Sequence, residues 1–298
     1  MNIYEVLRRP VITEKSNLMS EDGRYVFEVA RDGLDGSGEI VDLGCWLGSL
    51  TCSLALGRER NPRLLASSTR VHAFDQFIWL AGYMDVCWHD GLTIARPGNG
   101  ESFLPAFRFF TRRFAGAIVE HGAVGESPWT GAPIECLSVD AMKTPPLAQR
   151  ILTEFFPKLV PGGWLFHQDF CHYYTWWIHV YHFALRRHFE IDRALEGSSG
   201  VLFRLIAPLT QDDLDRAVAI DLGDSALADE AFAFSLEQVA TLDRGAVAAA
   251  HVWYEVRYER FEKARDLARR YEVEPGFAAE IAHAGPIPDV SPSDSRPT

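Results

Sequence analysis

The sequence has few cysteines, and their number and spacing argue against two kinds of site. Five cysteines occur in 298 residues, an odd number with no CxxC spacing. Neither a disulfide framework nor a zinc cluster is therefore indicated. Buried free thiols in a reducing compartment fit this pattern better. The five are Cys45, Cys52, Cys87, Cys136 and Cys171.

Long apolar runs are also missing, and acidic residues outnumber basic ones. No apolar stretch is long enough to span a bilayer, and the first residues lack the unbroken apolar segment of a signal peptide. We therefore expect a soluble, cytoplasmic protein with no membrane partner. The 41 acidic residues against 29 Lys and Arg give a formal net charge of -12. Proteins that grip nucleic acid by its phosphates usually carry the opposite sign, so a nucleic-acid partner is disfavoured.

What the sequence does contain is an ordinary share of hydrophobic residues, 47%, which is enough for a sizeable core. Apolar runs alternate with helical stretches, which is typical of a parallel sheet with crossover helices. The runs predicted as strands are 40–43, 71–74, 117–120, 134–139 and 164–167. Two further runs, 189–195 and 201–206, flank a glycine-containing loop and predict an antiparallel hairpin.

Residues 1–32 differ from the rest and are expected to form an N-terminal extension. The stretches YEVLRRPVITEKS and GRYVFEVA resemble the start of bacterial large-subunit ribosomal protein twenty-three, and the run 24–30 is expected to be extended. The basic rRNA-binding loop of that protein has no counterpart here, and so short a fragment cannot fold alone. We interpret it as a gene fusion or a misplaced start, with a ribosome-associated role as the alternative. The glycine-rich residues 33–38 follow as a hinge.

Three further segments are expected after this extension. The sheet domain should cover residues 33–208. Residues 209–283 are predicted to be helical and amphipathic, for example over 250–271, and to form an accessory cap or a dimer surface. Residues 284–298 are rich in Pro, Ser and Asp, which predicts a disordered tail.

A glycine-containing turn after the first strand is the strongest functional signal. The strand carries Asp42 and leads through Gly44 and Gly48 into a helix that begins at Ser49. Glycines let the backbone turn tightly and approach a ligand, and a helix start offers free N–H groups. Asp42 could orient the cationic amino-acid part of a ligand. The alternative is a purely structural strand-to-helix turn.

The residue between these glycines argues against a dinucleotide. A dinucleotide fold has a GxGxxG sequence here, whereas this chain has Trp46 at the position of the second glycine. The indole would block the close approach of a pyrophosphate, so a ligand without one fits better. A nicotinamide-dependent Rossmann enzyme stays as the disfavoured alternative. The second strand ends at Asp75, whose carboxylate can accept hydrogen bonds from a ribose diol.

These motifs resemble a known family. The stretch Asp42-Leu-Gly-Cys-Trp-Leu-Gly48 is similar to the glycine motif of the macrocin/mycinamicin O-methyltransferase family, in which a Trp also lies between the glycines. The resemblance covers about residues 36–208. It implies a class I, Rossmann-like methyltransferase, an α/β fold whose mostly parallel seven-stranded sheet ends in an antiparallel hairpin. It also implies S-adenosylmethionine as cofactor and a sugar, glycan or small-molecule hydroxyl as acceptor. The expected cofactor contacts are Asp42, Gly44, Cys45, Trp46, Gly48, Ser49, Asp75, Gln76, Gly122 and Ala123, with Trp129 as a stacking platform.

Two later strands predict the catalytic side of the crevice. Asp140 and Lys143 follow the strand 134–139, and Gln168 and Asp169 follow 164–167. The carboxyl ends of parallel strands open onto one crevice, so the oxygen atoms of Asp140, Gln168 and Asp169 should converge and could bind Mg²⁺. Lys143 could take the proton of the acceptor hydroxyl if its pKa is lowered.

The Asp-x-x-Lys spacing of this set also resembles catechol O-methyltransferase. The macrolide family has acids where this chain has Met142 and Gln168, which puts the metal in doubt. The alternative is that Asp140 and Asp169 only cap helices or loops.

Histidines gather after the fifth strand and offer a metal-free base, with His167 as a catalytic candidate. The others are His172, His179 and His182, of which the last two share a helix face. The neighbouring aromatic residues 173–177 could line a substrate pocket or belong to the core. A protein that binds the ligand without catalysis is also an alternative, because Met142 and Gln168 replace acids of the expected metal site.

Overall fold

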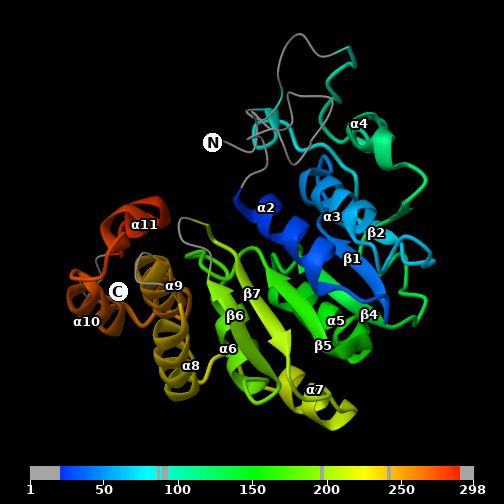
Figure 1. The fold of residues 1–298 in the computed structure, drawn as a ribbon. Helices are drawn as coiled ribbons and strands as arrows, with labels where there is room; N and C mark the ends of the chain where they lie inside the picture. Colours follow the sequence, from blue (N-terminus) through cyan, green and yellow to red (C-terminus); the bar gives the residue numbers. More distant parts are fainter. Residues whose placement is uncertain (1–20, 86–87, 89–92, 195–197, 240–242, 289–298) are drawn as a thin grey trace.

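The computed structural model describes residues 21–85, 88, 93–194, 198–239 and 243–288 (Figure 1). Its centre is a seven-stranded sheet in the order β3-β2-β1-β4-β5-β7-β6. The strands β1 to β5 are parallel to one another, while β7 is antiparallel to both β5 and β6. The predicted fold class is therefore confirmed. The strands are β1 Glu39–Leu43, β2 Val71–Phe74, β3 Ile118–His121, β4 Ile134–Val139, β5 Leu159–His167, β6 Phe189–Ala194 and β7 Val201–Leu205.

Helices cover both faces of this sheet, which explains why its central strands are buried along almost their whole length. Side chains of β1 alternate between two cores: Ile40 packs toward α2 and α3, and Val41 packs toward α5 and α6. The helix bounds are α2 Glu21–Glu28, α3 Ser49–Arg60, α4 Leu104–Thr111, α5 Pro145–Glu154, α6 Trp176–Ala184 and α7 Gln211–Val218.

The region predicted to be helical contains four more helices after α7, which gather beside the β6 edge of the sheet (Figure 1). They are α8 Ser225–Gln238, α9 Arg244–Arg257, α10 Phe261–Tyr271 and α11 Phe277–Ala284. The helical stretch expected over 250–271 is interrupted, because Glu259 adopts φ +58 between α9 and α10. Phe232 and Tyr254 belong to the same buried cluster as β4 and α6, so these helices share the core of the sheet.

The expectation of an extended run over 24–30 is wrong. Residues 21–28 form α2, and a π-helical turn over Val29–Gly33 continues it. Val26 and Ala30 are buried against α3, where Gly57 leaves room for them: a Cβ on Gly57 would lie 2.5 Å from the carbonyl oxygen of Phe27. The apolar side chains between Val26 and Leu34 thus pack in the core beside α3, and the boundary expected after residue 32 stays a prediction.

Three predicted features lie wholly or partly outside the described residues. The stretch YEVLRRPVITEKS and Cys87 lie wholly outside them. Of the expected tail, residues 285–288 are described and have no regular secondary structure.

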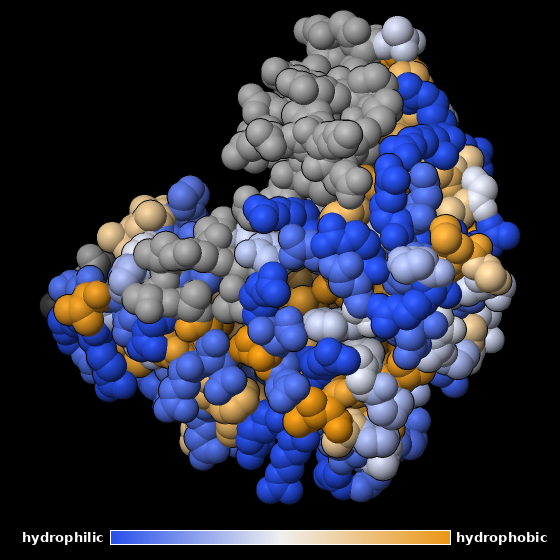
Figure 2. Space-filling model, in the orientation of Figure 1, coloured by the Kyte–Doolittle hydropathy of each residue, from blue (hydrophilic) through white to orange (hydrophobic). Residues whose placement is uncertain are grey.

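The surface seen in Figure 2 is mostly polar, with apolar residues in small scattered patches. In the part of the chain that the structure describes, we find no helix that combines the length and the apolar character needed to cross a membrane.

The packing of α2 on α3 predicts the effect of a side chain at position 57. Gly57→Val should lower the free energy of unfolding by about 1–3 kcal/mol, because the new methyl groups meet the backbone of α2. Thermal unfolding followed by circular dichroism measures it. Gly116→Val is the matched control, since a Cβ there meets nothing within 4 Å. Equal melting temperatures for the two variants would show that residues 21–33 do not stabilise the domain.

Candidate functional site

The turn between β1 and α3 folds over the end of β2. The N–H groups of Gly44 and Cys45 both donate to the carbonyl oxygen of Phe74, at 2.8 and 3.1 Å. The turn has three left-handed residues, Gly44 at φ +83, Trp46 at φ +48 and Gly48 at φ +92. Such a conformation is costly for a side chain as large as that of Trp46, so the surrounding structure must hold it in place.

The two glycines are required by contacts within the protein. A Cβ on Gly44 would lie 2.8 Å from the carbonyl oxygen of Asp140, and one on Gly48 would lie 2.4 Å from Cγ2 of Thr111. The turn therefore packs directly against the segment that follows β4 and against α4. The protein itself thus fills the space where a Cβ of either glycine would lie, and the approach of this backbone to a ligand stays a prediction.

Asp75 links the turn to β2. Its Oδ2 accepts the N–H of Trp46 at 3.0 Å, and its Oδ1 accepts the N–H of Phe77 at 3.0 Å. Phe77 is also left-handed, with φ +53. Burial raises the pKa of Asp75, while these backbone hydrogen bonds oppose the shift. A carboxylate oxygen has two lone pairs, so each oxygen can still accept a second hydrogen bond from a ligand.

Asp42 lies below this turn as a buried acid. Its side chain is 1% exposed, and its Oδ2 accepts the hydroxyl of Thr51 at 2.6 Å. Its Oδ1 has no hydrogen-bond partner among the described residues. Burial raises the pKa of Asp42 to about 6, the hydroxyls of Thr51 and Ser138 oppose the shift, and the charge of Asp75 adds to it. A buried acceptor left open in this way suits a cationic ligand group, reached directly or through water.

The other expected cofactor residues lie at the same edge of the sheet. Cys45 and Ser49 are buried in and just after the turn, and Gln76 is exposed directly after Asp75. Gly122 and Ala123 follow β3, where the N–H of Gly122 donates to Oγ of Ser127 at 2.9 Å. The carboxyl ends of three neighbouring strands thus bring these residues to one side of the molecule.

Trp129 does not serve as the expected stacking platform. Its ring is only 8% exposed, packs edge-on against His72, and donates from Nε1 to the carbonyl oxygen of Ala132. An aromatic group that the sequence reading missed lies beside the turn instead. Trp46 contacts Trp79 and Phe103, and Tyr83 meets it edge-on with ring centroids 6.3 Å apart. The sequence could have indicated this aromatic group, because three aromatic residues, at positions 77, 79 and 83, follow shortly after Asp75.

The predicted catalytic residues do come together. The ammonium group of Lys143 contacts Oδ1 of Asp140 and Oδ2 of Asp169, which follow the neighbouring strands β4 and β5. Asp140 does not cap the helix after it, because Thr144 does so by accepting the N–H of Leu147. Gln168 is half-buried between the strand end and Asp169, and its N–H donates to Val139 at 3.0 Å.

The charge state of Lys143 differs from the expectation. Burial lowers its pKa, but Asp140 and Asp169 outweigh that effect and raise the pKa above its usual range. Burial and the charge of Asp169 raise the pKa of Asp140, although Lys143 opposes this shift. The lowered pKa that a lysine base requires is therefore absent in this arrangement, because two carboxylates surround one ammonium group.

Three of the four histidines face the core instead of the crevice. His167 is 3% exposed among Phe156, Phe170 and Phe203, and burial lowers its pKa to about 4. As the last residue of β5, it points to the same face as Leu165, toward α5 and α6. The prediction of a catalytic role for His167 is therefore not supported.

His179 and His182 are likewise buried on α6. The Nδ1 of His179 lies 3.0 Å from Oγ of Ser235 on α8, and His182 packs on Phe203. Burial lowers both pKa values, so neither ring offers a base to the crevice. His172, by contrast, is half-buried near Lys143 and Asp169, whose charges act on its ring.

A group with metal-binding spacing occurs among the C-terminal helices and was not predicted. Asp229, His251 and Glu255 offer ligand atoms within 4.8 Å of one another. The ammonium group of Lys263 lies 2.8 Å from both carboxylates, and Arg260 lies 2.9 Å from Glu255. These two cations already neutralise the acids, so the cluster stabilises the helices. Asp229 comes from α8, whereas His251 and Glu255 lie four residues apart on α9, so only that pair had a local signal in the sequence.

Comparisons with known proteins give short or distant similarities. No family model matches the chain. The O-methyltransferase NovP is 15% identical, over 64% of this chain and 84% of its own, with a TM-score of 0.43. MNMC2 from Aquifex aeolicus is 12% identical, over 85% and 76% of the two chains, with a TM-score of 0.36. Neither likeness is close enough to assign an activity.

The curated relatives match only a short segment. Large ribosomal subunit protein uL23 of Dehalococcoides mccartyi is 55% identical over 31 residues, which are 10% of this chain and 33% of that protein. The protein of the same name from Streptococcus equi subsp. equi is 59% identical over 29 residues, 10% and 30% of the two chains. The chain thus spans about a third of the length of the curated relatives it matches.

The raised pKa of Asp42 predicts a pH-dependent stability. Because the folded state holds this proton more tightly than the unfolded state, stability falls as the pH rises from about 4 to about 6. The full penalty above that window is about 3 kcal/mol. The melting temperature of Asp42→Asn relative to wild type should therefore increase across the window and then level. Asp192→Asn, an exposed position on β6, is the control. Parallel profiles for wild type and Asp42→Asn would contradict the shift.

Proposed function

We propose that the protein is an S-adenosylmethionine-dependent methyltransferase that methylates a hydroxyl of a sugar, glycan or small molecule. The observation that carries the proposal is the position of Asp75, which lies hydrogen-bonded against the turn after β1. In open α/β sheets, ligands bind beyond the carboxyl ends of the strands where the strand order reverses. Here β1 lies between β2 and β4, so the chain reverses at the turn itself.

Two observations favour S-adenosylmethionine over a dinucleotide as the ligand. The sheet inserts an antiparallel β7 between β5 and β6, whereas the dinucleotide fold has the order 3-2-1-4-5-6. Trp46 stands where a dinucleotide fold needs a glycine, and its left-handed backbone places a large side chain at the turn. In our proposal Asp75 accepts hydrogen bonds from the ribose hydroxyls. The Oδ1 of Asp42 accepts one from the ammonium group of the amino-acid part.

The cofactor would supply a methyl group that is already activated on a sulfonium, so the protein mainly has to orient the acceptor. For the acceptor hydroxyl to be methylated, it would have to lose its proton to a group of this chain. We assign that proton to Asp140, because an acid with a raised pKa is a better base near neutral pH. Lys143 keeps its charge and stabilises the negative charge that develops on the oxygen.

Magnesium stays a prediction from the sequence. The carboxylates of Asp140 and Asp169 and the amide of Gln168 are oxygen donors of the kind that this ion prefers. Lys143 now lies between the two carboxylates and neutralises part of their charge. An ion would have to displace its ammonium group, and these residues would then hold the ion and the acceptor oxygen together.

Cofactor binding tests the proposal directly. Calorimetry should show binding of S-adenosylmethionine and S-adenosylhomocysteine and none of NAD. Asp75→Asn should weaken the binding of both about tenfold to hundredfold, because hydrogen bonds to a charged partner are lost. Asp192→Asn should bind as wild type does, and circular dichroism checks the fold of each variant. Binding of NAD alone would favour the nicotinamide enzyme, and absence of all three would favour a non-catalytic or ribosome-associated module.

The role of Lys143 predicts a selective loss of turnover. With labelled methyl donor and a panel of hydroxyl acceptors, Lys143→Met should lower kcat about 100-fold or more, while the affinity for S-adenosylhomocysteine stays unchanged. Lys143→Arg should recover part of the rate because it retains the charge. Lys158→Met, at an exposed position before β5, is the control. Undiminished turnover of Lys143→Met would remove this residue from the mechanism, and loss of activity in EDTA that Mg²⁺ restores would establish the ion.

A further inference from the structure

A small cavity of about 10 Å³ lies in the core, between the end of β5 and the helices α5 and α6. A volume of this size has room for a single water molecule. Most of its lining is apolar, but three polar side chains also reach it: His167, which ends β5, and Tyr181 and His182 on α6. A molecule in this cavity would therefore meet polar partners inside an otherwise apolar core.

The ring of His167 contains a polar atom without a partner. Its Nδ1 is buried and makes no hydrogen bond with any described residue. Burial lowers the pKa of His167 to about 4, although the charge of Asp169 opposes this shift, so the ring is neutral near pH 7. A neutral imidazole carries one donor and one acceptor nitrogen. Because a buried polar atom left without a hydrogen bond is costly, a small polar ligand at this ring would stabilise the fold.

Tyr181 can supply the second partner of such a ligand. Its side chain is 2% exposed, and its buried hydroxyl makes no close hydrogen bond with a described residue. Burial raises the pKa of Tyr181, and Gln149 on α5 is near enough to oppose this shift. A phenol hydroxyl both donates and accepts, so a contact with Gln149 leaves it able to bind a second group. His182 adds a further neutral ring, because burial lowers its pKa.

The cavity also borders the segment that carries the proposed catalytic residues. Met142, which lies between Asp140 and Lys143 in the sequence, is 2% exposed and lines the cavity. Its carbonyl oxygen accepts the N–H of the Trp177 indole at 2.9 Å, which ties this segment to α6. A molecule that fills the cavity therefore packs against Met142, whose sequence neighbours hold the charges of the site.

We propose that one water molecule occupies this cavity, bound by Nδ1 of His167 and the hydroxyl of Tyr181, and that it holds the Met142 segment in place. The water site stands without the proposed function, whereas its effect on Asp140 and Lys143 rests on that function. Among the described residues that line the cavity there is no carboxylate to hold a cation. An apolar molecule would leave the two polar atoms without hydrogen bonds. His167 is then a positioning residue, which acts through the water and Met142.

Crystallography of the full wild-type chain tests the occupant directly, at a resolution that shows ordered water and with and without xenon pressure. We expect a single water peak within hydrogen-bond distance of both Nδ1 of His167 and the hydroxyl of Tyr181. We expect no xenon there, because polar cavities hold water whereas apolar cavities stay dry and bind xenon. A dry cavity, or one that takes up xenon, would overturn the inference, and this measurement does not depend on the stability of any variant.

Tyr181→Phe tests whether the water positions the segment, since it removes one partner of the water and keeps the ring. The chain has four methionines, so methyl NMR can follow Met142, with Met142→Leu as the assignment variant. Tyr181→Phe should shift the Met142 signal, leave that of Met84 unchanged, and lower kcat about threefold to tenfold at unchanged affinity for S-adenosylhomocysteine. Tyr25→Phe, at a half-buried position on α2, is the control.

The outcomes separate this inference from the proposed function. An unshifted Met142 signal or an unchanged kcat in Tyr181→Phe would refute the positioning role and leave the methyltransferase proposal standing. A water peak and a shifted Met142 signal in a protein that binds no adenosyl compound would support the water site and refute the proposed cofactor.

Discussion

The site depends on the carboxylate of Asp75. It ends β2 and accepts N–H groups from Trp46, in the turn after β1, and from Phe77, in the segment that leaves β2. Both donors have left-handed backbones that side chains seldom adopt. One half-buried acid thus stabilises two strained residues and joins the ends of two strands. The shape of the turn and its capacity to accept further hydrogen bonds therefore come from the same group.

A second group of charges lies across the strands β4 and β5. Two carboxylates and one ammonium group, from Asp140, Asp169 and Lys143, leave a formal excess of one negative charge. That excess keeps the lysine protonated and makes one acid easier to protonate than usual. In the proposed reaction the natural proton acceptor is a carboxylate, and the lysine acts through its charge. The roles proposed for Asp140 and Lys143 thus follow from the presence of two carboxylates beside one ammonium group.

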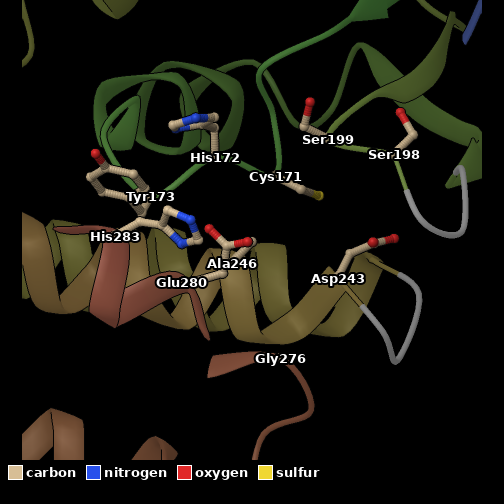
Figure 3. Close-up of a pocket in the computed structure, with 10 residues that line it drawn as sticks. All are labelled: Cys171, His172, Tyr173, Ser198, Ser199, Asp243, Ala246, Gly276, Glu280 and His283. Carbon is tan, nitrogen blue, oxygen red and sulfur yellow. The ribbon is translucent and has the colours of Figure 1, made fainter. Parts of the chain in front are cut away.

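The C-terminal helices are part of the same structure as the sheet. Phe232 and Tyr254 join the buried cluster of β4 and α6, and Ser235 holds the buried ring of His179. These contacts explain why the histidines after β5 stabilise the core. The same helices bring Asp243 and Glu280 to a cavity of about 400 Å³ that Cys171 and His172 also line (Figure 3). The packing of these helices therefore both buries His179 and forms one side of the cavity.

The sequence by itself determined the strands, the turn at Gly44 and Gly48, and the meeting of Asp140, Lys143 and Asp169. These follow from local patterns and from the rule that parallel strands present their carboxyl ends at one edge. Tertiary structure alone decided the conformation of residues 24–30, whose apolar side chains suit either a strand or a helix until α3 offers them a surface. It also decided the pKa of Lys143, the burial of His167 and the walls of the cavity, because burial and electrostatic fields depend on groups that are distant along the chain.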